Sequence, residues 1–232
     1  VADGNQFDQY EMTKSLLFAL SSAAFWVGLL NAIQEICKEH TIVKREYMTG
    51  LSLNAYLASK LLVLGILCFV QSSLMVAVLT SIIGLPGESV IFHPFLELLM
   101  TTFVTTVAAT AIGLFVSALF SNADRALTIA PILLMQILFS GLIFKLDGAT
   151  EYISWVAVSR WSVEGYGTTA NLNDLPLRLQ QQGIAIPHEA EAFFEFTPEH
   201  LLQSWAILAV YTLACLILAR IALSKIGDAR VR

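Results

Sequence analysis

Charge is what this sequence has least of. Only 13% of its 232 residues are Asp, Glu, Lys or Arg, whereas 56% are hydrophobic. An ordinary soluble domain has about 25% charged residues, and it needs them to cover its exterior. The few charges present here gather in short segments and cannot cover a soluble fold of this length. The composition therefore excludes an ordinary soluble protein.

A basic excess and a cysteine framework are also missing. The net charge is −5 at pH 7, and because nucleic-acid binding needs a basic surface, we expect no nucleic-acid partner. The three cysteines (Cys37, Cys68 and Cys215) have neither the spacing of a metal site nor that of a disulfide framework. We therefore expect no metal and no redox cofactor on this chain.

The chain is instead rich in long apolar runs. A bilayer core about 30 Å thick needs about 20 apolar residues of helix. Five such windows occur, at about 15–36, 57–83, 95–120, 126–144 and 202–222. The sequence predicts an all-α integral membrane protein, with residues 1–232 forming one transmembrane unit of five spans. Pro131 predicts a kink in the fourth span, because proline removes a helical hydrogen bond.

The basic residues predict how these spans are oriented, because positively charged loops stay in the cytoplasm. Nine of the thirteen lie on one side: Lys38, Lys44, Arg45, Lys60, Arg125, Arg220, Lys225, Arg230 and Arg232. We therefore expect a cytoplasmic C-terminus, a cytoplasmic segment at 37–52 and an external segment at 145–201. The N-terminal end is then external. Its start at Val1, without a signal pattern, predicts that this acidic stretch is an external loop that follows a span outside this sequence.

Aromatic residues mark part of the external segment. Tyr152, Trp155, Trp161 and Tyr166 alternate with aliphatic residues there. Such residues settle at membrane interfaces, so residues 151–166 are predicted to form an interfacial or re-entrant helix and not a sixth span. Arg160 and Glu164 are four residues apart in it, so that an ion pair between them is feasible.

The span interiors hold almost no titratable groups. A proton-driven carrier normally needs a carboxylate or histidine at mid-membrane, and the four histidines are expected outside the spans, so the energy for any transport comes from elsewhere. The neutral polar residues Asn31, Gln136 and Ser140 either line a path or bond across helices. Small residues at four-residue spacing favour close helix packing: Ala24, Gly28 and Ala32 in one span, and Ala109, Gly113 and Ser117 in another.

The cytoplasmic segment is too polar to cross the membrane. Its spacing of Glu35, Glu39, Ile42 and Glu46 is typical of a helix, and Gly50 is a natural helix stop. Composition alone allows two interpretations, a solvated loop or a docking surface for a soluble partner.

Four motifs follow one another along the chain, at 31–39 with 44–47, at 56–61, at 139–142 and at 159–164, and their order resembles that of type-2 ABC exporters of the G subfamily. Asn31-Ala-Ile-Gln-Glu-Ile-Cys-Lys-Glu39 with Lys44-Arg-Glu-Tyr47 looks like that family's second membrane helix and first intracellular loop. Tyr56-Leu-Ala-Ser-Lys60-Leu is similar to the start of its third helix. Phe139-Ser-Gly-Leu142 and Ser159-Arg-Trp-Ser-Val-Glu164 resemble the end of its fifth helix and its re-entrant external segment. The resemblance extends over about residues 10–225.

The resemblance implies that this chain holds helices two to six of a six-helix membrane domain. It implies a homodimeric or heterodimeric assembly with a translocation path between two membrane domains, and ATP and Mg²⁺ on an associated nucleotide-binding domain. No G-x-x-x-x-G-K-[ST] phosphate loop occurs here, so the ATPase would be fused upstream or separate, and this chain is not itself an enzyme. The absence of external cysteines favours a bacterial-type member, in an inner membrane.

The resemblance also assigns roles to residues. It places coupling to the ATPase at Glu39, Lys44, Arg45 and Glu46, and the re-entrant segment at Arg160, Trp161 and Glu164. Asn31, Gln136 and Ser140 become candidates for the path of an amphipathic or lipid-like substrate, which would be exported by alternating access.

Two other functions compete with this interpretation. A secondary carrier or channel should show internal repeats or broken helices, and only Pro131 points that way. An intramembrane enzyme should present a nucleophile and a base at one depth, and neither His nor Asp occurs in any predicted span.

Overall fold

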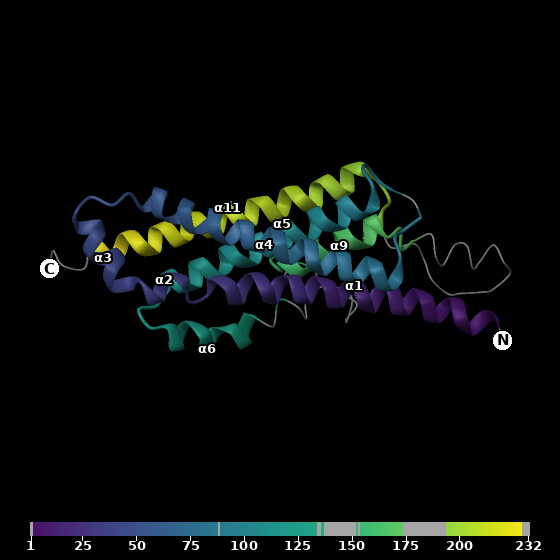
Figure 1. The fold of residues 1–232 in the computed structure, drawn as a ribbon, viewed down its shortest axis with the longest axis horizontal. Helices are drawn as coiled ribbons and strands as arrows, with labels where there is room; N and C mark the ends of the chain where they lie inside the picture. The colour runs from purple at the N-terminus through teal and green to yellow at the C-terminus, as the bar shows by residue number, and fades with distance from the viewer. Residues whose placement is uncertain are drawn as a thin grey trace.

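Long helices running side by side make up most of the molecule (Figure 1). The computed structural model describes residues 2–87, 89–133, 136, 152, 154–173 and 194–228. The four long helices are α1 (Ala2–Ala32), α4 (Leu53–Ile83), α5 (Pro94–Leu119) and α11 (Pro198–Asp228). Within the described residues, four segments are long and apolar enough to cross a membrane: Met12–Lys38, Leu53–Ile82, Pro94–Leu119 and Pro198–Lys225. The predicted all-α membrane fold class is confirmed.

The remaining predicted span begins in α6 (Ala123–Leu133), which contains Pro131. Apart from Gln136, the rest of that window, residues 134–144, lies outside the described residues. Ser140 is among them, and so the fourth predicted span stays a prediction.

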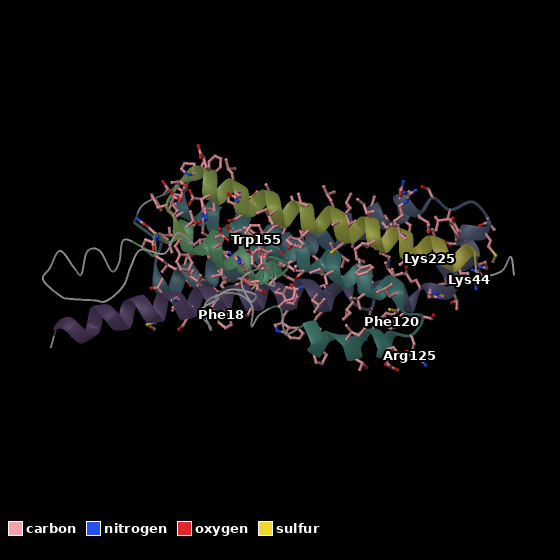
Figure 2. All side chains as sticks on the ribbon, turned by 180° about the vertical axis from the view of Figure 1, so that it is seen from behind. Phe18, Lys44, Phe120, Arg125, Trp155 and Lys225 are labelled. Atoms are coloured by element: carbon pink, nitrogen blue, oxygen red, sulfur yellow. The ribbon has the colours of Figure 1, made fainter. Side chains whose placement is uncertain are left out.

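The two termini lie at opposite ends of the bundle (Figure 1). The end that holds the C-terminus also holds α2 (Glu35–Lys38), α3 (His40–Met48) and the connection from α5 to α6; we call it the α3 end. The other end holds the connection from α4 to α5, α9 (Val158–Thr169) and the start of α11; we call it the α9 end. Residues that the charge count put on one side, such as Lys44, Arg125 and Lys225, share the α3 end (Figure 2).

Helix α5 is the core of the bundle. Most of its apolar window is buried inside the protein, whereas only about a fifth of the windows in α4 and α11 is buried. The exposed residues of α4 and α11 are large and apolar, for example Leu62, Ile66, Leu213 and Ile217. Large apolar side chains exposed in this way are typical of helices that cross a bilayer.

Glycines allow α1 and α5 to approach closely. A Cβ atom added at Gly113 would lie only 2.8 Å from the carbonyl oxygen of Leu29 and 2.9 Å from the Cβ of Ala32. A Cβ atom at Gly28 would collide with the backbone of Thr106. The two stripes of small residues therefore face each other, which confirms that they serve helix packing.

Helix α1 is longer than expected. It begins at Ala2, and the residues predicted to form an external loop are helical. That prediction was wrong because polarity alone does not end a helix: residues 2–14 contain no proline, and their single glycine lowers helix propensity only modestly.

Candidate functional site

A two-part helical turn projects from the α3 end. After α1 the chain forms the short α2 and then α3. Helix α3 ends at Met48, and Gly50, two residues further on, has a φ of +107°. The Gly50 N–H donates to the carbonyl of Tyr47 at 3.2 Å, and the Leu51 N–H to that of Glu46 at 3.0 Å. This is the Schellman arrangement, and it confirms Gly50 as the helix stop.

Ser117 of α5 fixes the start of this turn. Its Oγ accepts hydrogen bonds from the N–H groups of Ile36 and Cys37, at 2.9 and 3.0 Å, and all of these groups are buried. The first N–H groups of a helix have no partner within the helix, so a side-chain oxygen that accepts from them acts as a cap. A hydroxyl on the central helix thus positions α2.

An ion cluster fixes the turn to α4 as well. The Lys60 ammonium lies 3.3 Å from Oε2 of Glu35 and 2.9 Å from Oε2 of Glu39. The Tyr56 hydroxyl donates to the same Glu39 oxygen at 3.1 Å. The hydrogen bond from Lys60 lowers the pKa of Glu39, against the opposing effect of burial. Glu39 is therefore held as a carboxylate between α3 and α4.

The four predicted coupling residues lie together on this turn but face different surroundings. Arg45 and Glu46 are exposed. Lys44 is half-buried and lines a cavity together with Lys225 of α11 (Figure 2). Glu39 forms an ion pair with Lys60 and accepts a hydrogen bond from Tyr56. Arg45 and Glu46 are thus the two that are accessible to a partner.

At the α9 end, helix α9 is packed into the bundle. All 12 of its residues are buried. At 1.5 Å per residue it is about 18 Å long, too short to span a bilayer core. The expected non-spanning helix is therefore present. It begins at Val158 and not near residue 151 as predicted, so the four aromatic residues divide: Tyr152 and Trp155 precede α9 and are exposed, whereas Trp161 and Tyr166 lie on it and are buried.

Glu164 of α9 has a partner that the sequence spacing did not indicate. Its Oε1 lies 2.8 Å from Nε2 of His200. His200 was expected outside the spans, but it belongs to the first turn of α11, which begins at Pro198. Its other ring nitrogen lies 3.0 Å from the hydroxyl of Thr168. This pair connects α9 to α11.

Arg160 packs with its aromatic neighbours. Its guanidinium carbon is 5.7 Å from the ring centre of Trp155 and 5.5 Å from that of Trp161, and one of its nitrogens donates to Ser154. The indole N–H of Trp161 donates to the carbonyl of Trp155 at 3.0 Å. These contacts are typical of a cation held on aromatic faces, where arginine is favoured over lysine.

Comparison with known proteins assigns the family. A model described as "ABC-2 family transporter protein" matches residues 3–221. This chain belongs to the ABC-2 transporter family. It is also 30% identical, over 162 residues, to the "ABC transporter ATP-binding/permease protein Rv1747" of Mycobacterium tuberculosis. That alignment covers 68% of this chain and 19% of the relative, so the chain spans about a fifth of the relative's length. The resemblance drawn from the motifs is confirmed, and the protein is a multi-pass membrane transport component.

Two of the three polar residues proposed for a substrate path, Asn31 and Gln136, have protein partners in this ABC-2 membrane domain. The Asn31 amide donates to Oε1 of Gln71 on α4 at 2.6 Å. Oε1 of Gln136 accepts from the N–H of Val158 at 3.1 Å, at the first turn of α9. Both contacts favour bonding across helices, the second of the two interpretations that the sequence left open. The substrate path through Asn31, Gln136 and Ser140 stays a prediction.

Glu97, which sequence reasoning passed over, has a structural role in the ABC-2 domain. It is completely buried in the first turn of α5. Its Oε1 accepts hydrogen bonds from three successive N–H groups, those of Val90, Ile91 and Phe92, at 3.0, 2.7 and 2.8 Å. A carboxylate near a helix N-terminus, just after a proline, was the available signal. Glu97 holds the α4–α5 connection on the α9 end.

Replacing Glu97 with alanine is expected to lower the midpoint of thermal unfolding by about 4–8 °C in detergent, since about 2 kcal/mol is lost when these N–H groups lose their shared acceptor. Glu97→Gln keeps an acceptor oxygen and should lose less than half as much. Equal decreases of the unfolding midpoint in the two variants would show that the charge of Glu97, and not the hydrogen bonds that it accepts, stabilises this end.

Threonines form a second feature that sequence reasoning missed. Thr101, Thr102, Thr105, Thr106 and Thr110 are fully buried on α5. They bond to four different elements: Trp205 of α11 to Thr101, Tyr166 of α9 to Thr102, Ser72 of α4 to Thr106, and Thr110 to the Gly28 carbonyl of α1. Hydroxyls of this kind bind helices together where water is absent.

Proposed function

We propose that this chain is the permease part of an ATP-driven exporter. It moves an amphipathic or lipid-like substrate out of the cytoplasm by alternating access, in a plasma membrane of bacterial inner-membrane type, with its C-terminus in the cytoplasm. Family membership supports a permease, and the printed name of the relative joins ATP binding and permease in one protein. The observation that carries the proposal is an exposed, charged helix, α3, anchored at its base to two membrane helices.

The proposed partners follow from this assignment. ATP and Mg²⁺ bind a nucleotide-binding domain, fused or separate, because this sequence contains no phosphate loop. A second membrane domain, most simply another copy of this chain, forms the other wall of the path. The remaining surface of the spans is covered by the lipid bilayer.

The anchoring explains how movement would be transmitted. Ser117 attaches the turn to α5, and Lys60 attaches it to α4. A nucleotide-binding domain that moves α3 therefore moves both helices, and α5 carries the movement to α1 through the glycine contacts. Packed interfaces of this kind shift as units rather than deform, which suits alternating access.

The test reverses the charge of Arg45 in the complete transporter. Arg45→Glu removes an exposed cation on α3, so we expect substrate transport to fall by about tenfold or more while membrane insertion and basal ATP hydrolysis remain. The measurements are transport into inverted vesicles and ATPase activity with and without substrate. Arg125→Glu, an equal charge change on exposed α6 at the same end, is the control.

Two results would contradict the proposal. Unchanged stimulation of the ATPase by substrate in Arg45→Glu would remove α3 from coupling. Transport that persists when ATP hydrolysis is abolished would favour the alternative, a secondary carrier or channel.

A further inference from the structure

A cavity of about 590 Å³ lies at the α3 end, between α3, α5 and α11. Its polar lining includes His40 and Lys44 of α3 and Lys225 of α11. Its apolar lining includes Leu119 of α5 with Leu218 and Ile221 of α11. No acidic side chain is among the described residues that line it. The cavity thus combines two ammonium groups and an imidazole with an apolar wall.

The depth of the cavity matches that of lipid headgroups. Leu119 and Lys225 are the last residues of two candidate membrane spans. A bilayer crossed by these spans therefore has its phosphates near the two lysines. Figure 2 shows Lys44 and Lys225 together at this end, with Arg125 apart from them on α6.

The apolar wall continues onto the lipid-facing surface. Leu119, Leu218 and Ile221 are 53%, 45% and 46% exposed, although they line the cavity. An occupant can therefore place its anionic group between the lysines while its apolar chain lies along α11. A free phosphate makes no use of such a wall, whereas the acyl chain of a phospholipid does.

We propose that this cavity binds the headgroup of an anionic phospholipid. The Lys44 and Lys225 ammonium groups bind its phosphate, His40 supplies a further donor, and an acyl chain lies against Leu119 and Leu218. Basic pockets between membrane helices are suited to such headgroups. The proposal rests on the membrane-spanning fold and does not depend on ATP coupling. It gives Lys44 a role different from that of the exposed Arg45 and Glu46.

The experiment measures lipid preference in the complete protein. Native mass spectrometry from micelles that contain phosphatidylglycerol and phosphatidylcholine reports the ratio of the two lipids bound. A lysine near an anionic surface favours binding by about fivefold, so the double variant Lys44→Gln with Lys225→Gln should lose about 25-fold of the phosphatidylglycerol preference. Lys38→Gln with Arg125→Gln removes the same charge from exposed positions at the same end and should retain the preference.

Two further variants test the charge of the lysines and the apolar wall separately. Lys44→Arg with Lys225→Arg keeps both cations and should keep the preference within about twofold. Leu218→Asn should weaken lipid retention while leaving the cations in place. Retention by the arginine variant together with loss in the glutamine variant would support the proposal even if the glutamine variant is less stable.

Several outcomes would overturn it. Equal binding of the two lipids by the unmodified protein would do so, as would equal losses in the cavity and control variants. Full displacement of phosphatidylglycerol by soluble glycerol phosphate, with Leu218→Asn unaffected, would identify a site for a free anion. An unchanged lipid ratio in the lysine variants, together with lost stimulation of the ATPase, would assign Lys44 and Lys225 to the nucleotide-binding domain.

Discussion

Replacing Gly113 with leucine is expected to abolish the folded membrane domain. The first side-chain atom would already lie 2.8 Å from a backbone oxygen of α1 and 3.1 Å from a backbone nitrogen, and backbone cannot rotate away as a side chain can. Separating the helices would break the contact between α1 and the central helix and pull α2 from Ser117. We expect a loss of more than about 3 kcal/mol, enough to eliminate a marginally stable fold.

The measurement is the fraction of protein that elutes as a single species in detergent, with its midpoint of thermal unfolding. Gly65→Leu is the matched control, because Gly65 also lies within a membrane helix but has no atom within 4 Å of the corresponding Cβ position. Folding of Gly113→Leu at the level of Gly65→Leu would show that α1 and α5 do not pack in this register.

Replacing Lys60 with glutamate is the second change with a large expected effect. It removes the cation that neutralises Glu35 and Glu39 and places a third carboxylate beside them. Single exposed ion pairs contribute less than about 1 kcal/mol, but this variant exchanges two attractions for two repulsions at a partly buried position. The base of α3 should separate from α4, and coupled transport should fall by about tenfold or more.

A charge exchange distinguishes this mechanism from misfolding. Glu39→Lys combined with Lys60→Glu restores an opposite-charge pair between α3 and α4, and transport should recover by at least about threefold relative to Lys60→Glu. Lys38→Glu, on the same turn but exposed, should have little effect on transport. If the exchange variant transports no better than Lys60→Glu, the geometry of the cluster and not its charge is what coupling requires.

The motifs predicted more of the α3 end than of the α9 end. Gly50 could be identified as a helix stop because a Schellman ending is local and needs only a residue that tolerates positive φ. The partner of Glu39 could not be identified, because Lys60 lies 21 positions away on a different helix. For Glu164 the four-residue spacing indicated Arg160: burial raises the pKa of Glu164, and the positive charge of Arg160 acts to lower it against this larger effect. The spacing could not indicate His200. Local spacing identifies neighbours on one helix and gives no information about the helix packed against it.

The sequence by itself determined that this is a helical membrane protein of an ABC transporter, because hydrophobic length, charge sidedness and short motifs are read residue by residue along the chain. Tertiary structure alone decided which polar groups meet: Lys60 with Glu35 and Glu39, His200 with Glu164, and the amides of residues 90–92 with Glu97. It also decided that Lys44 and Lys225 line one cavity. The reason is physical. The bilayer selects apolar segments by their own composition, whereas the partner of a polar side chain depends on how helices far apart in sequence pack around α5.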